Sequence, residues 1–210
     1  MTWRGLVREM KRDPTENEQW SGQHLQGAFE AVSILEQIGV TRGQTLLDAG
    51  SGEGRFALPA ASMVGEKGKV YAVDSSRERI ESLRRLAQER GFDQVEALVA
   101  DVTEHIGVPA GSVDVCLMAN VFHELAENGQ VRGELREVKR LLRPAGLLAI
   151  LDFRKDVDRP PGPPLARRVD PIEVRRLVTQ YGFHEKSSSE VGRYHYLSVF
   201  TLPDIPAQRN

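Results

Sequence analysis

Cysteine is almost absent from this chain, and it has no long run of apolar residues. The single Cys116 has no partner for an internal disulfide bond and lies inside a short apolar stretch, so we interpret it as a small core residue. No stretch is long enough to cross a bilayer, and the first residues lack the hydrophobic core of a signal peptide. We therefore expect a cytoplasmic protein without a membrane span.

A strong net charge is also missing. The 28 Lys and Arg residues nearly balance the 30 Asp and Glu residues, which leaves a formal net charge of -2. Basic residues alternate with glutamates along the expected helices, which is typical of solvated, ion-paired faces. We therefore expect no nucleic-acid substrate, and since no His, Cys and carboxylate cluster has the spacing of metal ligands, we expect no metal.

The most informative stretch that is present runs from Leu46 to Gly54, with the sequence Leu-Leu-Asp-Ala-Gly-Ser-Gly-Glu-Gly. It predicts a buried strand, a tight turn and the start of a helix. Glycine lets the backbone adopt positive φ or approach a ligand closely, so we expect the amides of residues 51–54 to face that ligand. The spacing GxGxG departs from the GxGxxG of dinucleotide-binding proteins, and Asp48 precedes the first glycine. A ligand with an amino-acid end would suit both Asp48 and the amides; the alternative is a glycine-rich loop that binds nothing.

This stretch resembles the first motif of the class I S-adenosylmethionine-dependent methyltransferases. A second apolar run ends at Asp74, twenty residues past Gly54, where α/β nucleotide-binding folds place the carboxylate that binds the ribose hydroxyls. The alternative is that this position only leads into a helix capped by Ser75 or Ser76. A third run ends at Asp101, and the resemblance implies that this acid meets the adenine amine while Val102 packs beside the ring. Asp101 alone is equally typical of a turn.

Two further runs, 113–120 and 146–153, predict the fourth and fifth strands. Asn120 and His123 follow the fourth strand at the topological switch region, where open α/β sheets bind ligands, and the resemblance implies that they line the sulfonium end of the cofactor. An alternative is that His123 caps or packs the next helix. The phrase Leu-Leu-Arg-Pro-x-Gly before the fifth strand is a further family resemblance. The expected cofactor residues are Asp48, Gly50, Ser51, Gly52, Gly54, Asp74, Ser75, Asp101, Val102 and Asn120.

Methyl transfer needs an aligned nucleophile and, where that nucleophile carries a proton, a group to accept it. The candidates that follow the fourth and fifth strands are His123, Asp152 and Arg154. Tyr194 and His195 lie in the last expected hairpin, where the alternative is plain sheet packing.

The alternation of strands and helices predicts an α/β, Rossmann-like doubly wound sheet with helices on both faces. We expect helices over about 22–38, 54–64, 76–91, 128–142 and 171–181. The segments 183–191 and 194–202 are expected to close the sheet as two strands, and the resemblance implies seven strands in the order 3-2-1-4-5-7-6 with strand 7 antiparallel. We expect a leader or lid over 1–20, one domain over 21–202 and a tail over 203–210. The proline-rich stretch 159–164 predicts a loop at the pocket rim, or else a ligand for another domain.

The resemblance implies a methyltransferase that uses S-adenosylmethionine, releases S-adenosylhomocysteine and acts on a small molecule. Over residues 40–155 it is closest to the group that includes the ubiquinone and menaquinone biosynthesis methyltransferases. The chain lacks the Asn/Asp-Pro-Pro-Tyr/Phe motif of DNA amino-methyltransferases, the Pro-Cys nucleophile of cytosine-C5 enzymes and the several thiols of arsenite methyltransferases. Two alternatives stay open: a non-catalytic S-adenosylmethionine-binding regulator or partner subunit, and a nicotinamide-dependent oxidoreductase. A homodimer is also left open.

Overall fold

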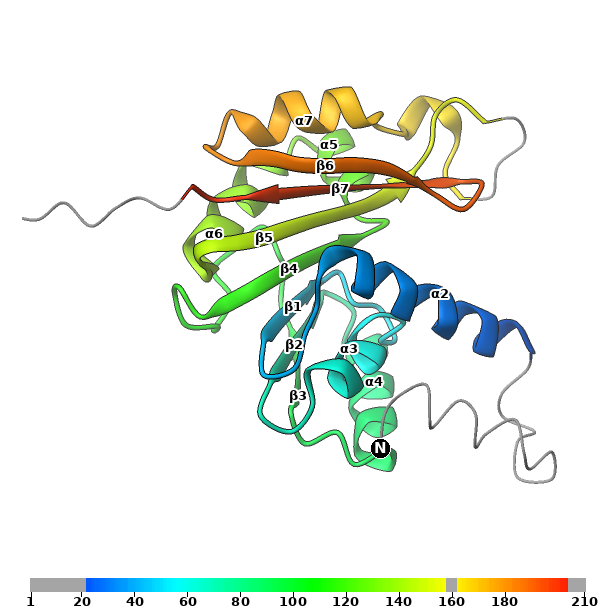
Figure 1. Ribbon diagram of the computed structural model, residues 1–210, viewed down its shortest axis with the longest axis vertical. Helices are drawn as coiled ribbons and strands as arrows, with labels where there is room; N and C mark the ends of the chain where they lie inside the picture. The colour runs from blue at the N-terminus through cyan, green and yellow to red at the C-terminus, as the bar shows by residue number, and fades with distance from the viewer. Residues whose placement is uncertain (1–21, 158–161, 204–210) are drawn as a thin grey trace, which may run out of the picture.

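The centre of the computed structural model, which describes residues 22–157 and 162–203, is a seven-stranded sheet in the order β3-β2-β1-β4-β5-β7-β6 (Figure 1). Strands β1 to β5 run parallel to one another, whereas β7 runs antiparallel to both β5 and β6. The predicted fold class and strand order are therefore confirmed. The strands are β1 (Thr45–Ala49), β2 (Lys69–Asp74), β3 (Val95–Val99), β4 (Val113–Ala119), β5 (Leu142–Phe153), β6 (His184–Val191) and β7 (His195–Thr201).

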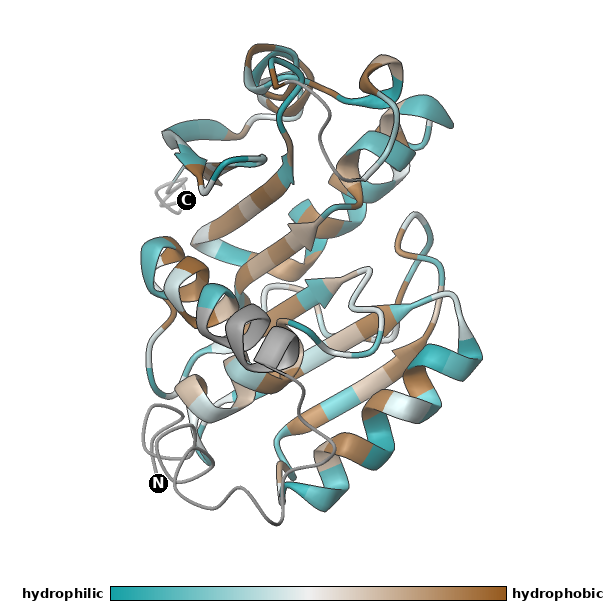
Figure 2. Cartoon of the chain, turned by 90° about the vertical axis from the view of Figure 1, so that its right-hand side faces the viewer, coloured by the Kyte–Doolittle hydropathy of each residue, from teal (hydrophilic) through white to brown (hydrophobic). Residues whose placement is uncertain are grey.

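Helices cover both faces of this sheet. The described helices are α2 (Gly22–Ile38), α3 (Ala57–Val64), α4 (Arg77–Glu89), α5 (Phe122–Glu127), α6 (Val131–Leu141), the 3-10 helix η1 (Leu165–Arg167) and α7 (Pro171–Thr179). One apolar cluster joins α2, α3 and α4 to one face, and a second joins α5, α6 and α7 to the other. Figure 2 shows the result as brown strands at the centre and helices whose teal sides face outward.

Strand β4 belongs to both clusters because alternate side chains of a strand point to opposite faces. Val115 and Leu117 lie in the first cluster, and Cys116 and Met118 lie in the second. All four side chains are 0% exposed. Burial raises the pKa of the Cys116 thiol well above its ordinary value, and Glu134 and Asp48 add to the shift. This environment supports the interpretation of Cys116 as a core residue.

Several helix boundaries differ from the sequence-based prediction. α3 begins at Ala57 rather than near 54, because Gly54 has a φ of 93° and cannot belong to a right-handed helix. The helix expected over 128–142 is α6, which begins at Val131, and α5 is a separate helix that lies before the expected range. Asn128 caps the end of α5, and Gly129 follows with a φ of 68°, which is a common way for a helix to end.

Strand β5 begins four residues before the predicted Gly146. Leu142 already has an extended backbone and pairs with Val113 of β4. Pro144 then holds the preceding Arg143 in an extended conformation, which suits a strand better than a helix. The proline therefore lies inside the strand, while α6 ends at Leu141.

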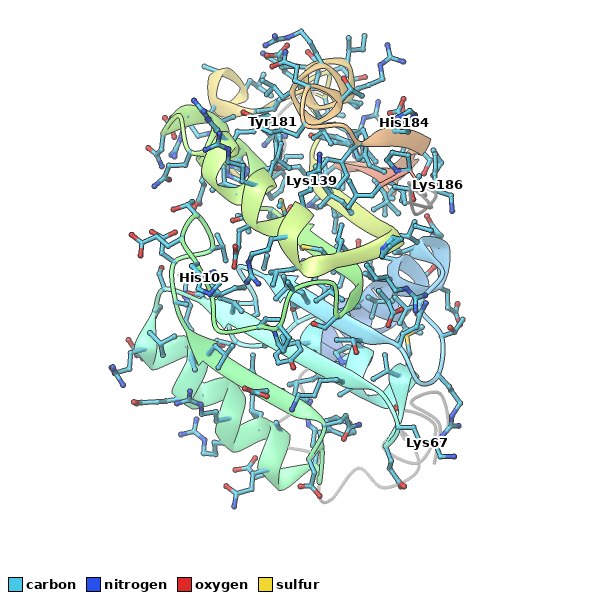
Figure 3. The ribbon with its side chains drawn as sticks, turned by 90° about the vertical axis from the view of Figure 1, so that its left-hand side faces the viewer. Lys67, His105, Lys139, Tyr181, His184 and Lys186 are labelled. Carbon is cyan, nitrogen blue, oxygen red and sulfur yellow. The ribbon has the colours of Figure 1, made fainter. Side chains whose placement is uncertain are left out.

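Two predicted helix starts and one predicted helix end are confirmed. Ser76 caps α4 by accepting the N–H of Arg79 at 3.4 Å, and Asp170 caps α7 by accepting the N–H of Glu173 at 2.9 Å. Gly39, with a φ of 93°, ends α2. Lys139 of α6 donates from Nζ to the carbonyl of Tyr181 at 3.0 Å, which ties α6 to the turn after α7 (Figure 3).

Some predictions fall outside the described residues. These are the leader 1–20, residues 159–161 of the proline-rich stretch and residues 204–210 of the tail. Within α2, the apolar side chains of Val32, Leu35 and Ile38 are buried. Among the helices of residues 22–157 and 162–203, none combines the length and the apolar character that a membrane crossing needs.

Candidate functional site

A pocket of about 360 Å³ opens where β1, β2, β3 and β4 reach their carboxyl ends. Parallel strands bring these ends to one edge of the sheet, and ligands of open α/β folds bind at that edge. Of the ten residues that the sequence predicts for the cofactor, six line this pocket: Gly50, Asp74, Ser75, Asp101, Val102 and Asn120.

The glycine-rich turn after β1 is held against the end of β2. The N–H groups of Gly50 and Ser51 both donate to the carbonyl of Val73, at 2.8 and 2.9 Å. The N–H of Gly52 donates to Asp74 Oδ2 at 2.9 Å, and that of Gly54 donates to the carbonyl of Ser51 at 3.0 Å. The prediction that the amides of residues 51–54 face a ligand is therefore wrong for Ser51, Gly52 and Gly54, because they donate within the protein.

Close packing explains why this turn requires glycine. Gly50, Gly52 and Gly54 have φ values of 76°, 54° and 93°. A Cβ atom on Gly50 would collide with the side chain of Val121, while one on Gly52 would meet nothing within 4 Å. Gly50 thus brings the turn against the segment that follows β4, and Gly52 leaves an open side.

Asp48 lies beneath this turn and is 1% exposed. Burial raises the pKa of Asp48 to about 7, the N–H of Ala57 opposes that shift, and Asp74 adds to it. Its Oδ2 is buried without a hydrogen-bond partner among the described residues. An unpaired buried carboxylate oxygen is costly, so a cationic donor at this point would offset that cost.

Asp74 is the residue that joins the turn to the helix after β2. One carboxylate oxygen accepts the N–H of Gly52, and the other accepts the N–H of Ser76 at 2.9 Å. Arg79 Nη1 is 3.9 Å from Oδ2. Because a carboxylate has about four acceptor positions, these contacts leave capacity for ribose hydroxyls.

Asp101 forms a turn at the opposite end of the pocket. Its Oδ1 accepts the N–H of Thr103 at 2.8 Å and the Thr103 hydroxyl at 2.7 Å. Asp101 is therefore the turn former that the alternative interpretation described, and it lines the pocket together with Val102.

Asn120 has the left-handed backbone that few residues other than glycine adopt, with a φ of 59°. Its N–H donates to the carbonyl of Leu151 at 2.8 Å, which fixes it between the ends of β4 and β5. Its Oδ1 is buried without a hydrogen-bond partner in the described part of the chain. A strained residue with an unpaired acceptor beside a pocket is typical of a ligand-binding position.

His123 and Asp152, both predicted from the sequence, form a buried pair. His123 is 4% exposed and Asp152 is 0% exposed. Nδ1 of His123 is 2.9 and 3.1 Å from the two Asp152 oxygens, and its backbone N–H donates to Oδ2 at 3.0 Å. This hydrogen bond raises the pKa of His123, although burial opposes the shift. The pair fixes the ring and leaves Nε2 as its second reactive nitrogen.

His195 packs against the ring of Phe153. The two ring centroids are 4.5 Å apart, and Nε2 of His195 is buried without a hydrogen-bond partner among the described residues. Burial lowers the pKa of His195, and the charge of Arg55 lowers it further. His123 and His195 are thus brought to the same ring with opposite pKa shifts, which is a pattern found in acid and base pairs.

Arg154 and Tyr194 hold the last hairpin to the end of β5. The N–H of Arg154 donates to the carbonyl of Tyr194 at 2.8 Å. The Arg154 guanidinium forms ion pairs with Asp156 at 2.8 Å and with Glu190 at 2.5 Å. These contacts indicate that Arg154 positions the hairpin. A catalytic role for Arg154 stays a prediction.

Sequence reasoning missed Phe153 and Arg168 as site residues. The Phe153 ring contacts both histidines, with the His123 centroid at 6.0 Å in an edge-on arrangement. Its position directly after Asp152 was a usable signal. Arg168 is 2% exposed, and its guanidinium lies 5.0 Å from the Phe153 ring centroid. No local pattern distinguishes it from Arg167 in the sequence. Among the described residues, no group of His, Cys, Asp and Glu is arranged to hold a metal ion.

Comparisons with known proteins agree on one family. A family model described as a methyltransferase domain matches residues 41–180. The ubiquinone/menaquinone biosynthesis C-methyltransferase UbiE of Hahella chejuensis is 28% identical over 171 residues, which are 81% of this chain and 65% of that protein. UbiE of Salmonella arizonae is 31% identical over 171 residues, or 64% of its length. The chain thus spans about two thirds of the length of these curated relatives.

A solved structure is similar over nearly its whole length. It is described as a SAM-dependent methyltransferase from Aquifex aeolicus, with a TM-score of 0.76 and 30% sequence identity. The match covers 93% of this chain and 98% of the Aquifex chain.

Proposed function

Because this chain belongs to the methyltransferase domain family, we propose that it transfers a methyl group from S-adenosylmethionine to a small-molecule acceptor. When bound, the cofactor supplies a methyl group on a sulfonium for in-line displacement and leaves as S-adenosylhomocysteine. The observation that carries the proposal is the convergence of three strand ends, β1, β2 and β4, on buried or pocket-lining polar side chains: Asp48, Asp74 and Asn120.

The residues present fit this cofactor. Asp48 Oδ2, Ser51 Oγ and Asn120 Oδ1 are buried and lack hydrogen-bond partners among the described residues. A ligand with an ammonium group would satisfy the Asp48 acceptor and thereby offset the cost of burying it. We assign the methionine end to Asp48 and the turn from Gly50 to Gly54, the ribose to Asp74 and Ser75, and the adenine to Asp101 and Val102.

For the acceptor side, we propose that His123 handles the proton of the nucleophile. Asp152 fixes the orientation of the ring through Nδ1, so Nε2 is the nitrogen that exchanges a proton. The raised pKa of His123 makes its neutral ring a stronger base than an ordinary histidine. His195 and Arg154 remain candidates for orienting the acceptor from the opposite side.

A small-molecule acceptor is supported by the curated relatives, which are named as C-methyltransferases of ubiquinone and menaquinone biosynthesis. The formal net charge of -2 provides no general attraction for nucleic acid.

The first test is titration calorimetry with S-adenosylhomocysteine. We expect Asp74→Ala to weaken binding by about 1–3 kcal/mol, because ribose hydroxyls lose their acceptor and the glycine turn loses its anchor at Gly52. Asp114→Ala is the matched control. That carboxylate also accepts a backbone N–H, from Thr45 at 2.6 Å, but it does not line the pocket.

Unchanged affinity in Asp74→Ala would remove the ribose assignment, and a folded wild-type protein that ignores S-adenosylhomocysteine at millimolar concentration would overturn the proposed function. Mass spectrometry of a panel of small-molecule acceptors then separates a transferase from a regulator, since the regulator binds the cofactor and methylates nothing.

A further inference from the structure

At the end of β5, the ring of Phe153 is contacted by several side chains. His195 lies against it at 4.5 Å, His123 approaches its edge at 6.0 Å, and the guanidinium of Arg168 lies 5.0 Å from its centroid. Gly162 of the proline-rich stretch also packs here, because a Cβ atom on it would come within 2.6 Å of the Phe153 ring. His123 is held separately by Asp152, so a shift of the Phe153 ring would act mainly on His195.

Arg168 is held firmly in place. Its Nε donates to the carbonyl of Pro163 at 2.9 Å, and its Nη1 donates to the carbonyl of Arg154 at 2.7 Å. The side chain thus joins the segment before α7 to the residue after Phe153. A planar guanidinium can make these two bonds and still contact an aromatic ring, which a lysine ammonium cannot reproduce.

We propose that Arg168 is a positioning residue that fixes the orientation of the His195 ring through the Phe153 ring. The use of His195 by an acceptor rests on the proposed function. The control of His195 by Arg168 is a property of the protein alone, so the two are tested separately.

The charges around His195 agree with this role. Burial lowers the pKa of His195 most and Arg55 lowers it further, Glu30 and Asp152 raise it, and Arg168 has the smallest effect, which also lowers it. Glu30 and Arg55 pair with each other at 2.8 Å, so their opposite effects partly cancel. The neighbouring Arg167 instead pairs with Glu127, and its charge acts on His123. Two adjacent arginines thus face different histidines.

The test is an NMR titration of both imidazole rings in the wild type and three variants. In Arg168→Met we expect the His195 ring chemical shift to change, because the Phe153 ring loses the guanidinium that packs on it, and the His195 midpoint to rise, since a nearby positive charge is lost. Arg168→Lys keeps the charge but loses the planar contact, so we expect a midpoint near that of the wild type and a changed ring chemical shift. Arg167→Met is the matched control, and we expect it to leave His195 unchanged.

The proposal is overturned if Arg168→Met and Arg168→Lys change the His195 signals no more than Arg167→Met does. If Arg168→Met fails to fold, Phe153→Leu tests the same path, and an unchanged His195 ring shift in that variant is also decisive against it. Calorimetry with S-adenosylhomocysteine is run on each variant. If the wild type does not bind S-adenosylhomocysteine, the proposed function is contradicted. The His195 titration would still decide the role of Arg168.

Discussion

Asp48 and Asn120 are polar side chains that the fold buries while leaving an oxygen of each without a hydrogen-bond partner among the described residues. Such groups cost free energy, and proteins usually keep them where a ligand supplies the missing partner. Asp48 meets this cost in part by a raised pKa, because a neutral carboxyl is cheaper to bury than a charged one. A ligand ammonium would favour the charged form again.

The raised pKa of Asp48 predicts a pH dependence. Since Asp48 must be charged to bind an ammonium group and titrates near pH 7, we expect S-adenosylhomocysteine to bind about tenfold more tightly at pH 8 than at pH 6. Asp48→Asn should bind more weakly and lose this part of the dependence. Calorimetry at pH 6, 7 and 8 checks it, and identical pH profiles for the two proteins would contradict the assignment.

The same shift affects stability with a definite sign. Between the ordinary value of 3.8 and about 7, the folded protein keeps a proton on Asp48 that the unfolded chain has released. The Asp48 contribution to the free energy of unfolding therefore falls as pH rises through this window and is constant above it.

At the scale of elements, the glycine turn is a backbone clamp between β1 and β2 rather than a row of amides facing a ligand. Val73 and Asp74 accept the N–H groups of Gly50, Ser51 and Gly52. The turn thus places Asp48 below the pocket and lets the segment after β4 pack against Gly50.

Alanine substitutions separate the two reasons why this turn requires glycine, which are positive φ and close packing. Gly50→Ala and Gly52→Ala both force an alanine into positive φ, which costs about 1–2 kcal/mol. Gly50→Ala also collides with Val121, so we expect it to lower the free energy of unfolding by a further 1–3 kcal/mol or so. Urea unfolding measures the difference. Equal destabilisation by the two variants would show that Val121 moves aside without cost.

The strands and the polar residues at their ends were predictable from the sequence, because an apolar run marks each strand and a polar residue marks the point where it ends. Asp74, Asp101 and Asn120 follow this rule, and all three line the pocket. The break between α5 and α6 was also within reach, since Asn128-Gly129 is a common helix ending. The direction of the turn amides was not, because it depends on Val73, a contact between two strands that local sequence does not encode.

Arg168 marks the limit of sequence reasoning at the site. Its burial depends on carbonyl groups of Pro163 and Arg154, which lie in different segments and meet only after the hairpin closes. The adjacent Arg167 has the same side chain and a half-exposed ion pair instead. The two residues are of the same type and adjacent in the sequence, so only the tertiary fold distinguishes them.

At the scale of the whole molecule, two apolar clusters share one sheet. Strands β1, β2, β4, β5 and β7 contribute alternate side chains to each cluster, so neither face can lose its helices without exposing strands that support the other. We therefore expect the described domain to unfold as one cooperative unit.

Matched substitutions on the two faces test this cooperativity. Leu35 of α2 and Leu135 of α6 are each 0% exposed and belong to different clusters. We expect Leu35→Ala and Leu135→Ala each to cost about 2–5 kcal/mol and to shift one common transition, followed by circular dichroism and by hydrogen exchange of strand amides. A transition that splits into two steps in either variant would show that the faces unfold independently.

Because Cys116 lies at the centre of β4, the rate at which its thiol is alkylated reports how often the sheet opens. A thiol reacts with alkylating reagents as its thiolate, and here both burial and a raised pKa suppress that form while the sheet is intact. Labelling of this single thiol therefore reports opening of the sheet. It also means that a cysteine engineered onto the surface would be labelled alone in the native protein, so a fluorophore could be attached to the molecule without first removing a natural residue.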